Sequence, residues 1–377
     1  GVAQSPAPSP TQSTAPTTEL RKIRDVVLYN NPGFHSAFPS VVVRPDGTIL
    51  CAFRRAPDRR ALWGGHITHT DANAYLVMVE STDSGLTWTP EPRIFFTHTL
   101  GGSQDPCMIQ LRDGSVLCAS YGWAVVPEPR LKESPSMPKE PPFGFLGGYV
   151  IRSTDAGKTW GSPIEPPVLP GETATDALGR PCPTYNRGAL LECRDGRLLW
   201  AVVRHDAVSL GLSSVHLIES RNGGLAWTYV GPIAVDGKIS FNETSLVETA
   251  GGDIVAFLRT AGFGGRGAVA RSTDGGKTFQ PWKDMGFVGE PFQVSRLPSG
   301  KILLVYGYRA KPCGIRARLL DPEARPIGKE GRSADNEARP ADSEARSIGD
   351  APLADAPEIV LRDDGGSGDL GYPWSVV

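Results

Sequence analysis

A short motif that recurs four times constrains the fold of this chain more than any other feature. The motif reads S-x-D-x-G-x-x-W, and its copies lie at 81–88, 153–160, 220–227 and 272–279, with Asn222 and Phe279 as mild departures. The Asp or Asn side chain can accept hydrogen bonds from its own turn, glycine allows a positive φ, and the aromatic ring can pack back onto a sheet. Each copy follows an apolar segment, so the motif predicts a hairpin corner with a structural role.

Tight turns of a second kind alternate with this motif along the chain. They lie at Asp46-Gly47, Asp113-Gly114, Asp195-Gly196, Gly251-Gly252 and Ser299-Gly300. Each precedes an apolar run, which predicts a hairpin, and the alternation of the two turns predicts successive four-stranded antiparallel meanders. This is the blade of a β-propeller. With 370–377 as the start of a sixth inner strand and 25–29 as the strand that closes that blade, we expect an all-β, six-bladed β-propeller.

Two departures from the repeat qualify this prediction. The fifth blade should carry a hairpin corner, but residues 321–358 are rich in Glu, Ala, Arg and Asp and repeat Glu-Ala-Arg at 323, 337 and 344. This composition is typical of a solvated, partly disordered insertion. The sequence stops at Val377, where the other blades go on to a turn and a second strand, so we expect an incomplete last blade with an open edge. The predicted domains are a leader at 1–20 and the propeller at 21–377.

Composition excludes several classes of partner. The formal net charge of -2 gives no basic field for nucleic acid, and no apolar run is long enough to span a membrane. Gly1 to Gln4 resemble the residues left at a signal-peptidase cut and precede a Pro/Ser/Thr-rich stretch, which predicts a secreted or periplasmic protein. We expect a monomer.

The six cysteines show no metal-binding spacing, so we expect no metal and no cofactor. They are typical of small buried residues in strands. A Cys182–Cys193 disulfide stays open as an alternative.

The repeat also gives a register for candidate site residues. The position eight residues before each turn is Phe38, Asp105, Arg187 or Glu243, and aligning Pro373 with Pro39 and Pro106 places Tyr372 there in the sixth blade. Equivalent inner-strand starts converge on the axis of a propeller, so Asp105, Arg187, Glu243 and Tyr372 should ring one pocket. Counting eight forward gives Arg54, Tyr121 and Arg259, with Arg204 and Arg309 close to the equivalent positions.

These repeats resemble the Asp-box (BNR) family, whose best-known enzymes are exo-α-sialidases. The segment 241–259 is similar to the sialidase segment that carries the glutamate partner of the nucleophile and one arginine of the carboxylate-binding triad, which implies these roles for Glu243 and Arg259. Gly371-Tyr-Pro-Trp-Ser375 resembles the segment with the tyrosine nucleophile, which implies that role for Tyr372. Arg309 is the choice for another triad arginine, with Arg316 as the alternative.

The chain departs from the family pattern at two places. The family's first arginine belongs to an Arg-Ile-Pro motif, but this chain reads Ala37-Phe38-Pro39, so Arg54 or Arg55 would have to replace it. The acid/base aspartate normally precedes the first Asp box by several residues. Within 68–75 the best match is Asp71, with His69 nearby as a modulator or replacement.

The resemblance implies a sialidase-type glycoside hydrolase acting on sialylated or other acidic glycans. Arginines would bind the sugar carboxylate, Glu243 would serve as base for Tyr372, and Asp71 would protonate the leaving oxygen. A second hypothesis is hydrolysis or β-elimination of a uronate-containing glycan, which the missing triad arginine and the His66/His69 pair favour. A third hypothesis is a non-catalytic glycan-binding propeller, whose axis would lack a coupled Glu–Tyr pair.

Overall fold

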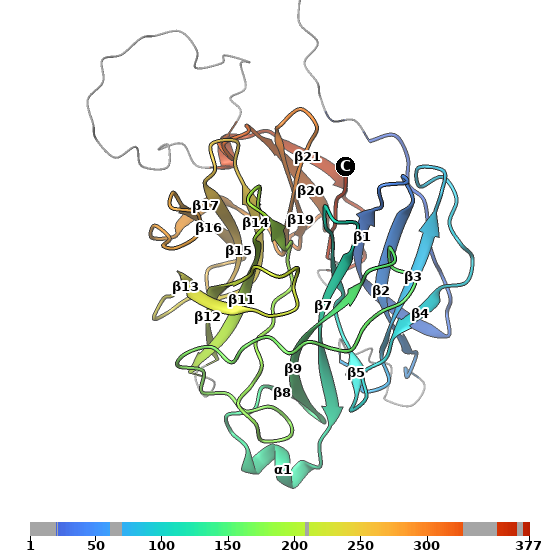
Figure 1. Ribbon diagram of the computed structural model, residues 1–377, viewed down its shortest axis with the longest axis vertical. Helices are drawn as coiled ribbons and strands as arrows, with labels where there is room; N and C mark the ends of the chain where they lie inside the picture. The colour runs from blue at the N-terminus through green and yellow to red at the C-terminus, as the bar shows by residue number, and fades with distance from the viewer. Residues whose placement is uncertain (1–19, 21, 61–69, 208–210, 327–352, 368–371) are drawn as a thin grey trace, which may run out of the picture.

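The computed structural model describes residues 20, 22–60, 70–207, 211–326, 353–367 and 372–377. Its described residues form five antiparallel β-sheets arranged as blades of a propeller (Figure 1). The leader and the middle of the predicted insertion lie outside these residues. No helix in the described part of the chain is long and apolar enough to cross a membrane.

Four of the five sheets follow the predicted four-stranded meander, and the second sheet departs from it with five strands. The first comprises β1 (Phe34–Val43), β2 (Ile49–Pro57), β3 (Tyr75–Ser81) and β4 (Arg93–Phe96). The second comprises β5 (Gly102–Ser103), β6 (Cys107–Gln110), β7 (Val116–Val125), β8 (Lys139–Glu140) and β9 (Phe143–Ser153), with helix α1 (Glu128–Glu133) between β7 and β8. Its strands lie in the order β5-β7-β9-β8, and β6 also pairs with β7.

The third sheet comprises β10 (Leu191–Glu192), β11 (Leu198–Ala207), β12 (Leu212–Ser220) and β13 (Thr228–Ala234). The fourth comprises β14 (Ser240–Glu248), β15 (Ile254–Ala261), β16 (Arg266–Ser272) and β17 (Lys283–Val288). The fifth comprises β18 (Phe292–Arg296), β19 (Ile302–Tyr308), β20 (Gly314–Leu320) and β21 (Glu358–Arg362), with a 3-10 turn, η2 (Leu353–Asp355), before β21.

The expectation of six blades is wrong for the structure, which has five. It counted 370–377 as a sixth inner strand and 25–29 as its closing strand, but neither described segment pairs in a ladder. Residues 372–377 are held instead by side-chain contacts to β18, where the N–H of Ser375 donates to Gln293 Oε1 at 2.9 Å. Figure 1 shows the C-terminal end between β1 and the fifth sheet.

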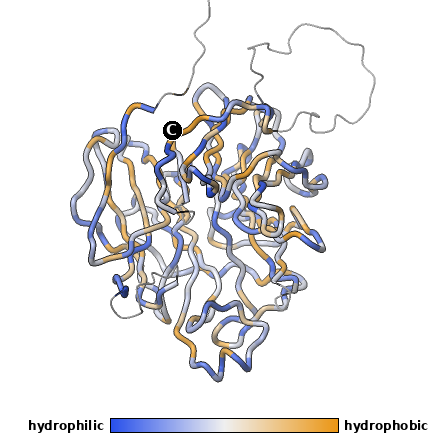
Figure 2. The backbone as a smooth tube through the Cα atoms, turned by 180° about the vertical axis from the view of Figure 1, so that it is seen from behind, coloured by the Kyte–Doolittle hydropathy of each residue, from blue (hydrophilic) through white to orange (hydrophobic). Residues whose placement is uncertain are grey.

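The core lies between successive sheets, where apolar side chains from both faces interdigitate. One cluster joins each neighbouring pair from the first to the fifth blade, and among the described residues no cluster joins the fifth blade to the first. The outer face of the first blade packs against Leu28 and Tyr29. Figure 2 shows that hydrophobic stretches occur throughout the sheets. This packing supports a sheet-on-sheet propeller.

The four repeated motifs form hairpin corners, as the sequence predicts. In the first, Asp83 accepts hydrogen bonds from the backbone N–H of Thr87 at 2.9 Å and from its hydroxyl at 2.6 Å. Ser84 and Gly85 have φ values of 60° and 80°, which is the geometry of a type I′ turn. The Trp88 ring packs against the first blade. The carboxylates of these motifs are therefore occupied by their own turns.

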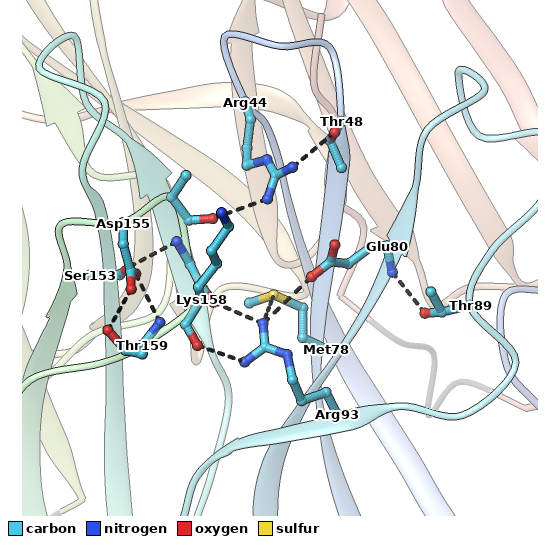
Figure 3. A network of polar contacts seen from close by, with 12 residues as sticks. Arg44, Thr48, Met78, Glu80, Thr89, Arg93, Ser153, Asp155, Lys158 and Thr159 are labelled. Carbon is cyan, nitrogen blue, oxygen red and sulfur yellow. Dashed lines mark hydrogen bonds and ion pairs between the residues drawn. The ribbon is translucent and has the colours of Figure 1, made fainter.

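Arginines of the first blade bind the corner of the second blade (Figure 3). Arg93 donates from Nη2 to the carbonyl oxygen of Gly157 at 2.8 Å, and Arg44 donates to that of Ala156 at 3.4 Å. Arg197 of the third blade makes the equivalent contact with Gly275 of the fourth at 3.1 Å. The corners therefore join neighbouring blades as well as closing their own hairpins.

The described ends of the predicted insertion belong to the fifth blade. Ala324, Leu353 and Ala356 are buried in the core cluster between the fourth and fifth blades. Residues 327–352 lie outside the described residues. All six cysteines are buried and unpaired, and Cys182 and Cys193 lie in different clusters, so the alternative of a disulfide between them is not realised.

Candidate active site

One pocket, of about 170 Å³, is lined by three of the residues that the repeat register predicts to lie at the axis. They are Asp105, Arg187 and Glu243. The inner strands of the third and fourth blades approach closely there, because the N–H of Thr244 donates to the carbonyl oxygen of Arg187 at 3.1 Å. Gly188 allows this approach, since a Cβ at that residue would lie 1.9 Å from the Thr244 carbonyl oxygen. The fold itself thus brings Arg187 and Glu243 to the same pocket.

Tyr372 and Glu243 form a hydrogen-bonded pair. The Tyr372 hydroxyl donates to Glu243 Oε1 at 2.8 Å. Arg259 Nη1 donates to the same oxygen at 2.9 Å and to the Tyr372 hydroxyl at 3.2 Å. The second oxygen of the carboxylate, Oε2, is buried and has no hydrogen-bond partner among the described residues. The pair that the sequence predicts from two distant segments is therefore in contact.

The surroundings of Tyr372 keep its phenol neutral. Burial raises the pKa of Tyr372 well above its usual value, and the negative charges of Glu243 and Asp105 raise it further, while Arg259 opposes them. Burial alone would lower the pKa of Arg259, but Glu243, Tyr372 and Glu290 outweigh that effect and raise it. A neutral phenol beside a carboxylate that can take its proton, with a fixed cation on both, is the arrangement that nucleophilic catalysis by tyrosine requires.

Arg187 lies against the face of the Tyr372 ring. Its guanidinium carbon is 4.6 Å from the centre of that ring and 5.5 Å from the centre of the Trp374 ring. Nη1 and Nη2 donate to the carbonyl oxygens of Pro106 at 3.2 Å and Pro39 at 2.8 Å. Arg187 therefore connects the first two blades to the segment that carries Tyr372.

Glu290 bridges the two arginines predicted for the triad. Arg259 Nε donates to Glu290 Oε2 at 2.8 Å, and Arg309 Nε lies 3.8 Å from Glu290 Oε1. The alternative, Arg316, is buried in the fifth blade, where its guanidinium stacks on the Tyr308 ring at 4.8 Å and contacts Glu358. Arg309 is therefore the candidate that shares a partner with Arg259.

Asp105 and two tyrosines form another wall of the pocket. The Tyr121 hydroxyl lies 3.4 Å from Asp105 Oδ2, and the Tyr185 hydroxyl donates to the Asp105 carbonyl oxygen at 3.1 Å. Burial raises the pKa of the Asp105 carboxyl, while Arg187 opposes this effect. Asp105 Oδ1 is buried without a partner in the described structure. This wall offers polar atoms to a ligand beside aromatic surface.

Arg54 takes the place nearest to the missing family arginine. It is the cross-strand partner of Ala37, so the two side chains leave the same face of the sheet. Arg54 is completely buried, lies 3.1 Å from His35 Nδ1 through Nη1, and has no partner for Nε or Nη2 within the described residues. Arg55 points to the other face, where it stacks on Phe34 and bonds to Tyr29 and Tyr75.

The predicted acid, Asp71, is buried but already engaged. Its carboxylate accepts hydrogen bonds from Arg59 Nε at 2.7 Å and from the Asn73 N–H at 2.7 Å. Asp71 does not line the pocket of Glu243. His69, like His66, lies outside the described residues. The structure thus brings together Asp105, Arg187, Glu243, Arg259 and Tyr372, with Arg309 adjacent, and Asp71 is close enough for its charge to act on Arg54.

Several residues of the site were not singled out from the sequence. Tyr185, Asn186, Asn242 and His205 line the pocket, and Glu290 joins the arginines. In this blade the count of eight residues forward from the turn pointed to Arg204. Its guanidinium bonds to Asp206 and to the Pro170 carbonyl oxygen. The register between β11 and β12 shifts after Arg204, so His205, the next residue, reaches the pocket. A bulge of this kind leaves no clear mark in the sequence.

Comparison with known proteins identifies the family. A model described as a BNR repeat-like domain matches residues 143–320. A Dyadobacter fermentans DSM 18053 protein of unknown function is 49% identical, with a TM-score of 0.84, over 94% of this chain and 90% of that chain. The chain therefore belongs to the same family as this Dyadobacter fermentans protein, and its middle part matches the BNR repeat-like domain. No curated protein matches the sequence.

More distant solved structures share the fold alone. The Hadza microbial sialidase Hz136 is 20% identical with a TM-score of 0.53, over 76% of this chain and 56% of that chain. A Penicillium chrysogenum α-L-arabinanase is 14% identical with a TM-score of 0.50, over 77% of this chain and 78% of that chain. Because enzymes with different substrates share this fold, the function must be argued from the site.

Proposed function

We propose that the chain is an exo-acting glycoside hydrolase of sialidase type, which releases terminal α-linked sialic acid from glycoconjugates. The observation that carries this proposal is the triangle of Tyr372, Glu243 and Arg259, with the phenol donating to the carboxylate at 2.8 Å. A coupled pair of this kind has no use in a propeller that only binds glycans.

The chemistry of a sialoside explains why a tyrosine suits this site. The anomeric carbon of sialic acid carries a carboxylate, so a neutral phenol approaches it with less repulsion than a second carboxylate would. Glu243 takes the proton as the phenol oxygen bonds to the anomeric carbon through an oxocarbenium-like state. Arg259 sits next to both groups and opposes the build-up of negative charge.

The sugar carboxylate needs cations with unused donors. Arg259 Nε and Nη1 are used on protein carboxylates, and among the described residues the Arg309 guanidinium has one ionic contact, with Glu290 at 3.8 Å. Arg54 has two buried nitrogens without partners in the described chain. We assign these three arginines to the carboxylate of the substrate, because guanidinium groups bind carboxylates bidentately.

The proposal is tested by release of 4-methylumbelliferone from its α-sialoside. We expect activity in the wild type and a loss of about 10²–10⁴-fold in kcat for Glu243→Gln and for Tyr372→Phe. Tyr229→Phe is the matched control, because it also removes a bonded phenol hydroxyl, at His216, but lies away from the pocket. Normal turnover by Tyr372→Phe would overturn the proposal.

A uronate-containing glycan is the second candidate substrate. The observation that favours it is the presence of Tyr121, Tyr185 and His205 in one pocket with Arg187, since tyrosine and histidine can move the protons of a β-elimination. A wild type that leaves sialosides intact but forms an unsaturated product absorbing in the near ultraviolet would establish the lyase. A wild type that cleaves no acidic glycan would favour the third hypothesis, a propeller that binds glycans without cleaving them.

A further inference from the structure

His205, for which the sequence predicts no role, lines the pocket of Glu243. His205 lies near the end of β11, and its side chain is 25% exposed. Behind it is Glu172, from the loop between β9 and β10, whose side chain is 1% exposed. The pocket thus contains a titratable ring at its surface with a buried carboxylate behind it.

The carboxylate of Glu172 is held in place by four hydrogen bonds or close contacts. Oε2 accepts from the backbone N–H of His205 at 3.0 Å and lies 3.3 Å from His205 Nδ1. Oε1 accepts from the backbone N–H groups of Thr173 at 2.9 Å and Ala174 at 2.7 Å. Burial would raise the pKa of Glu172, but the hydrogen bonds and the charge of His205 outweigh it and lower that pKa. Glu172 is therefore a fixed anion next to the ring.

This contact decides which ring nitrogen is available. Nδ1 faces Glu172, and Nε2 makes no hydrogen bond with the residues that the structure describes. The Thr173 hydroxyl donates to the His205 carbonyl oxygen at 3.0 Å, which fixes the backbone as well. A carboxylate on one imidazole nitrogen orients the ring and favours its protonated form, so that the other nitrogen can give up a proton.

Asp71, the acid predicted from the sequence, is less suited to donate a proton to the leaving oxygen. One oxygen of Asp71 accepts a hydrogen bond from Arg59 and the other accepts one from Asn73, and a protonated carboxyl would have to give these up in part. Glu172 contacts the His205 ring, Arg204 and Asp206 flank His205 in the chain, and the charged residues Asp105, Arg187 and Glu243 line the same pocket.

We infer that His205, oriented by Glu172, is the acid/base residue of the site. This inference rests on the proposed function. In the first step the phenol proton of Tyr372 moves to Glu243, the phenol oxygen bonds to the anomeric carbon, and the glycosidic C–O bond breaks. Its electron pair stays on the leaving oxygen, which takes the proton from His205 Nε2 and departs as an alcohol.

In the second step water attacks the anomeric carbon and gives one proton to the neutral His205. The bond to Tyr372 breaks, and the phenolate recovers its proton from Glu243. The sum is glycoside plus water to sugar plus alcohol, with every residue restored.

The test compares two sialosides with different leaving groups. The alcohol of sialyllactose needs protonation to leave, whereas 4-methylumbelliferone leaves readily as its anion. For His205→Gln we expect kcat/KM to fall about 10²–10⁴-fold on sialyllactose and less than about tenfold on the fluorogenic sialoside. Glu172→Gln should also lower kcat/KM more on sialyllactose than on the fluorogenic sialoside, but by a smaller factor. Asp71→Asn should change kcat/KM on both substrates by the same factor.

The pH profile gives a readout that loss of folding would not imitate. A general acid gives kcat/KM on sialyllactose an alkaline limb, and this limb should be missing in His205→Gln. Equal losses on both substrates for His205→Gln, or a leaving-group dependence in Asp71→Asn, would overturn the assignment while leaving the proposed function intact. A wild type silent on both substrates would overturn the proposed function, and the role of His205 with it.

Discussion

The register puts Arg187 at the axis, where we predict that it binds the substrate, and the structure places it in the pocket wall. In the structure it is 3% exposed, and both Nη atoms donate to backbone carbonyl oxygens while the guanidinium faces the Tyr372 ring. Because these contacts join Arg187 to the Tyr372 ring, we propose that Arg187 positions Tyr372 as well.

Replacement of this arginine separates the two roles. We expect Arg187→Met to lower kcat about 10- to 100-fold with little change in KM, because the ring of Tyr372 loses its support while substrate contacts remain. Steady-state kinetics on the fluorogenic sialoside measure both constants. A raised KM with unchanged kcat would instead restore the predicted role of Arg187 in substrate binding.

Single residues were predictable where the repeat gave a register and not where local geometry decided. Glu243, Arg259 and Tyr372 follow from position and type. His205 and Glu290 do not, because a bulge places the first and a contact between blades gives the second its role. Asp71 was chosen from the family spacing, and no feature of the sequence shows that Arg59 would bind it.

Among the elements, the hairpin corners make a pH-dependent contribution to stability. Hydrogen bonds from the Thr278 hydroxyl and backbone, with Ser272, lower the pKa of Asp274 to about 2, and Thr87 and Ser81 do the same for Asp83. A carboxylate with a lowered pKa in the folded state adds stability above its unfolded pKa of about 3.8, and this stability is lost as the pH falls toward 2.

The corner at 220–227 provides a natural comparison, because Asn222 accepts the equivalent hydrogen bonds without a charge. Asp274→Asn should therefore have a lower Tm than the wild type at pH 6, and the difference should narrow as the pH falls from 4 to 3. Thermal unfolding followed by circular dichroism at pH 6, 4 and 3 measures this. The converse variant, Asn222→Asp, should become more sensitive to acid. A difference in Tm that is independent of pH would contradict the account.

For the molecule as a whole, the meander and its order were predictable, but the number of blades was not. The turns mark the inner hairpin of each of the five sheets, and the repeated motif marks the outer corner of the first four. The sixth blade was inferred from two end segments, and alignment of Pro373 with Pro39 located Tyr372 without making its segment a strand. A strand exists only where a neighbour supplies a ladder, and the described C-terminal residues have side-chain partners instead.

The site therefore depends on how this segment is held to the fifth blade. Gln293 accepts from the Ser375 N–H at 2.9 Å and its hydroxyl at 2.5 Å, and donates to the Ser375 carbonyl oxygen at 3.3 Å. We expect Gln293→Leu to speed amide exchange at 374–377 and to lower kcat about tenfold or more, because Tyr372 moves from its place. Exchange read by mass spectrometry and turnover measure the two effects.

Gln110→Leu is the matched control for that variant. Gln110 lines the same pocket as Gln293 and the C-terminal residues, but its side-chain hydrogen bonds with the described residues go to its own hairpin, at Leu111 and Ser115. It should leave the exchange of the C-terminal segment and the turnover unchanged. Equal effects of the two variants would show that Gln293 acts through general stability.

The central claim is that Tyr372 attacks the sugar with Glu243 as its base, and covalent trapping tests it most directly. A 2,3-difluorinated sialic acid loses fluoride without an acid and leaves a glycosyl-enzyme that hydrolyses slowly. Peptide mapping by mass spectrometry should find the sugar on Tyr372 in the wild type and no label in Tyr372→Phe. A wild type that turns over sialosides but carries the sugar on any other residue would contradict the account.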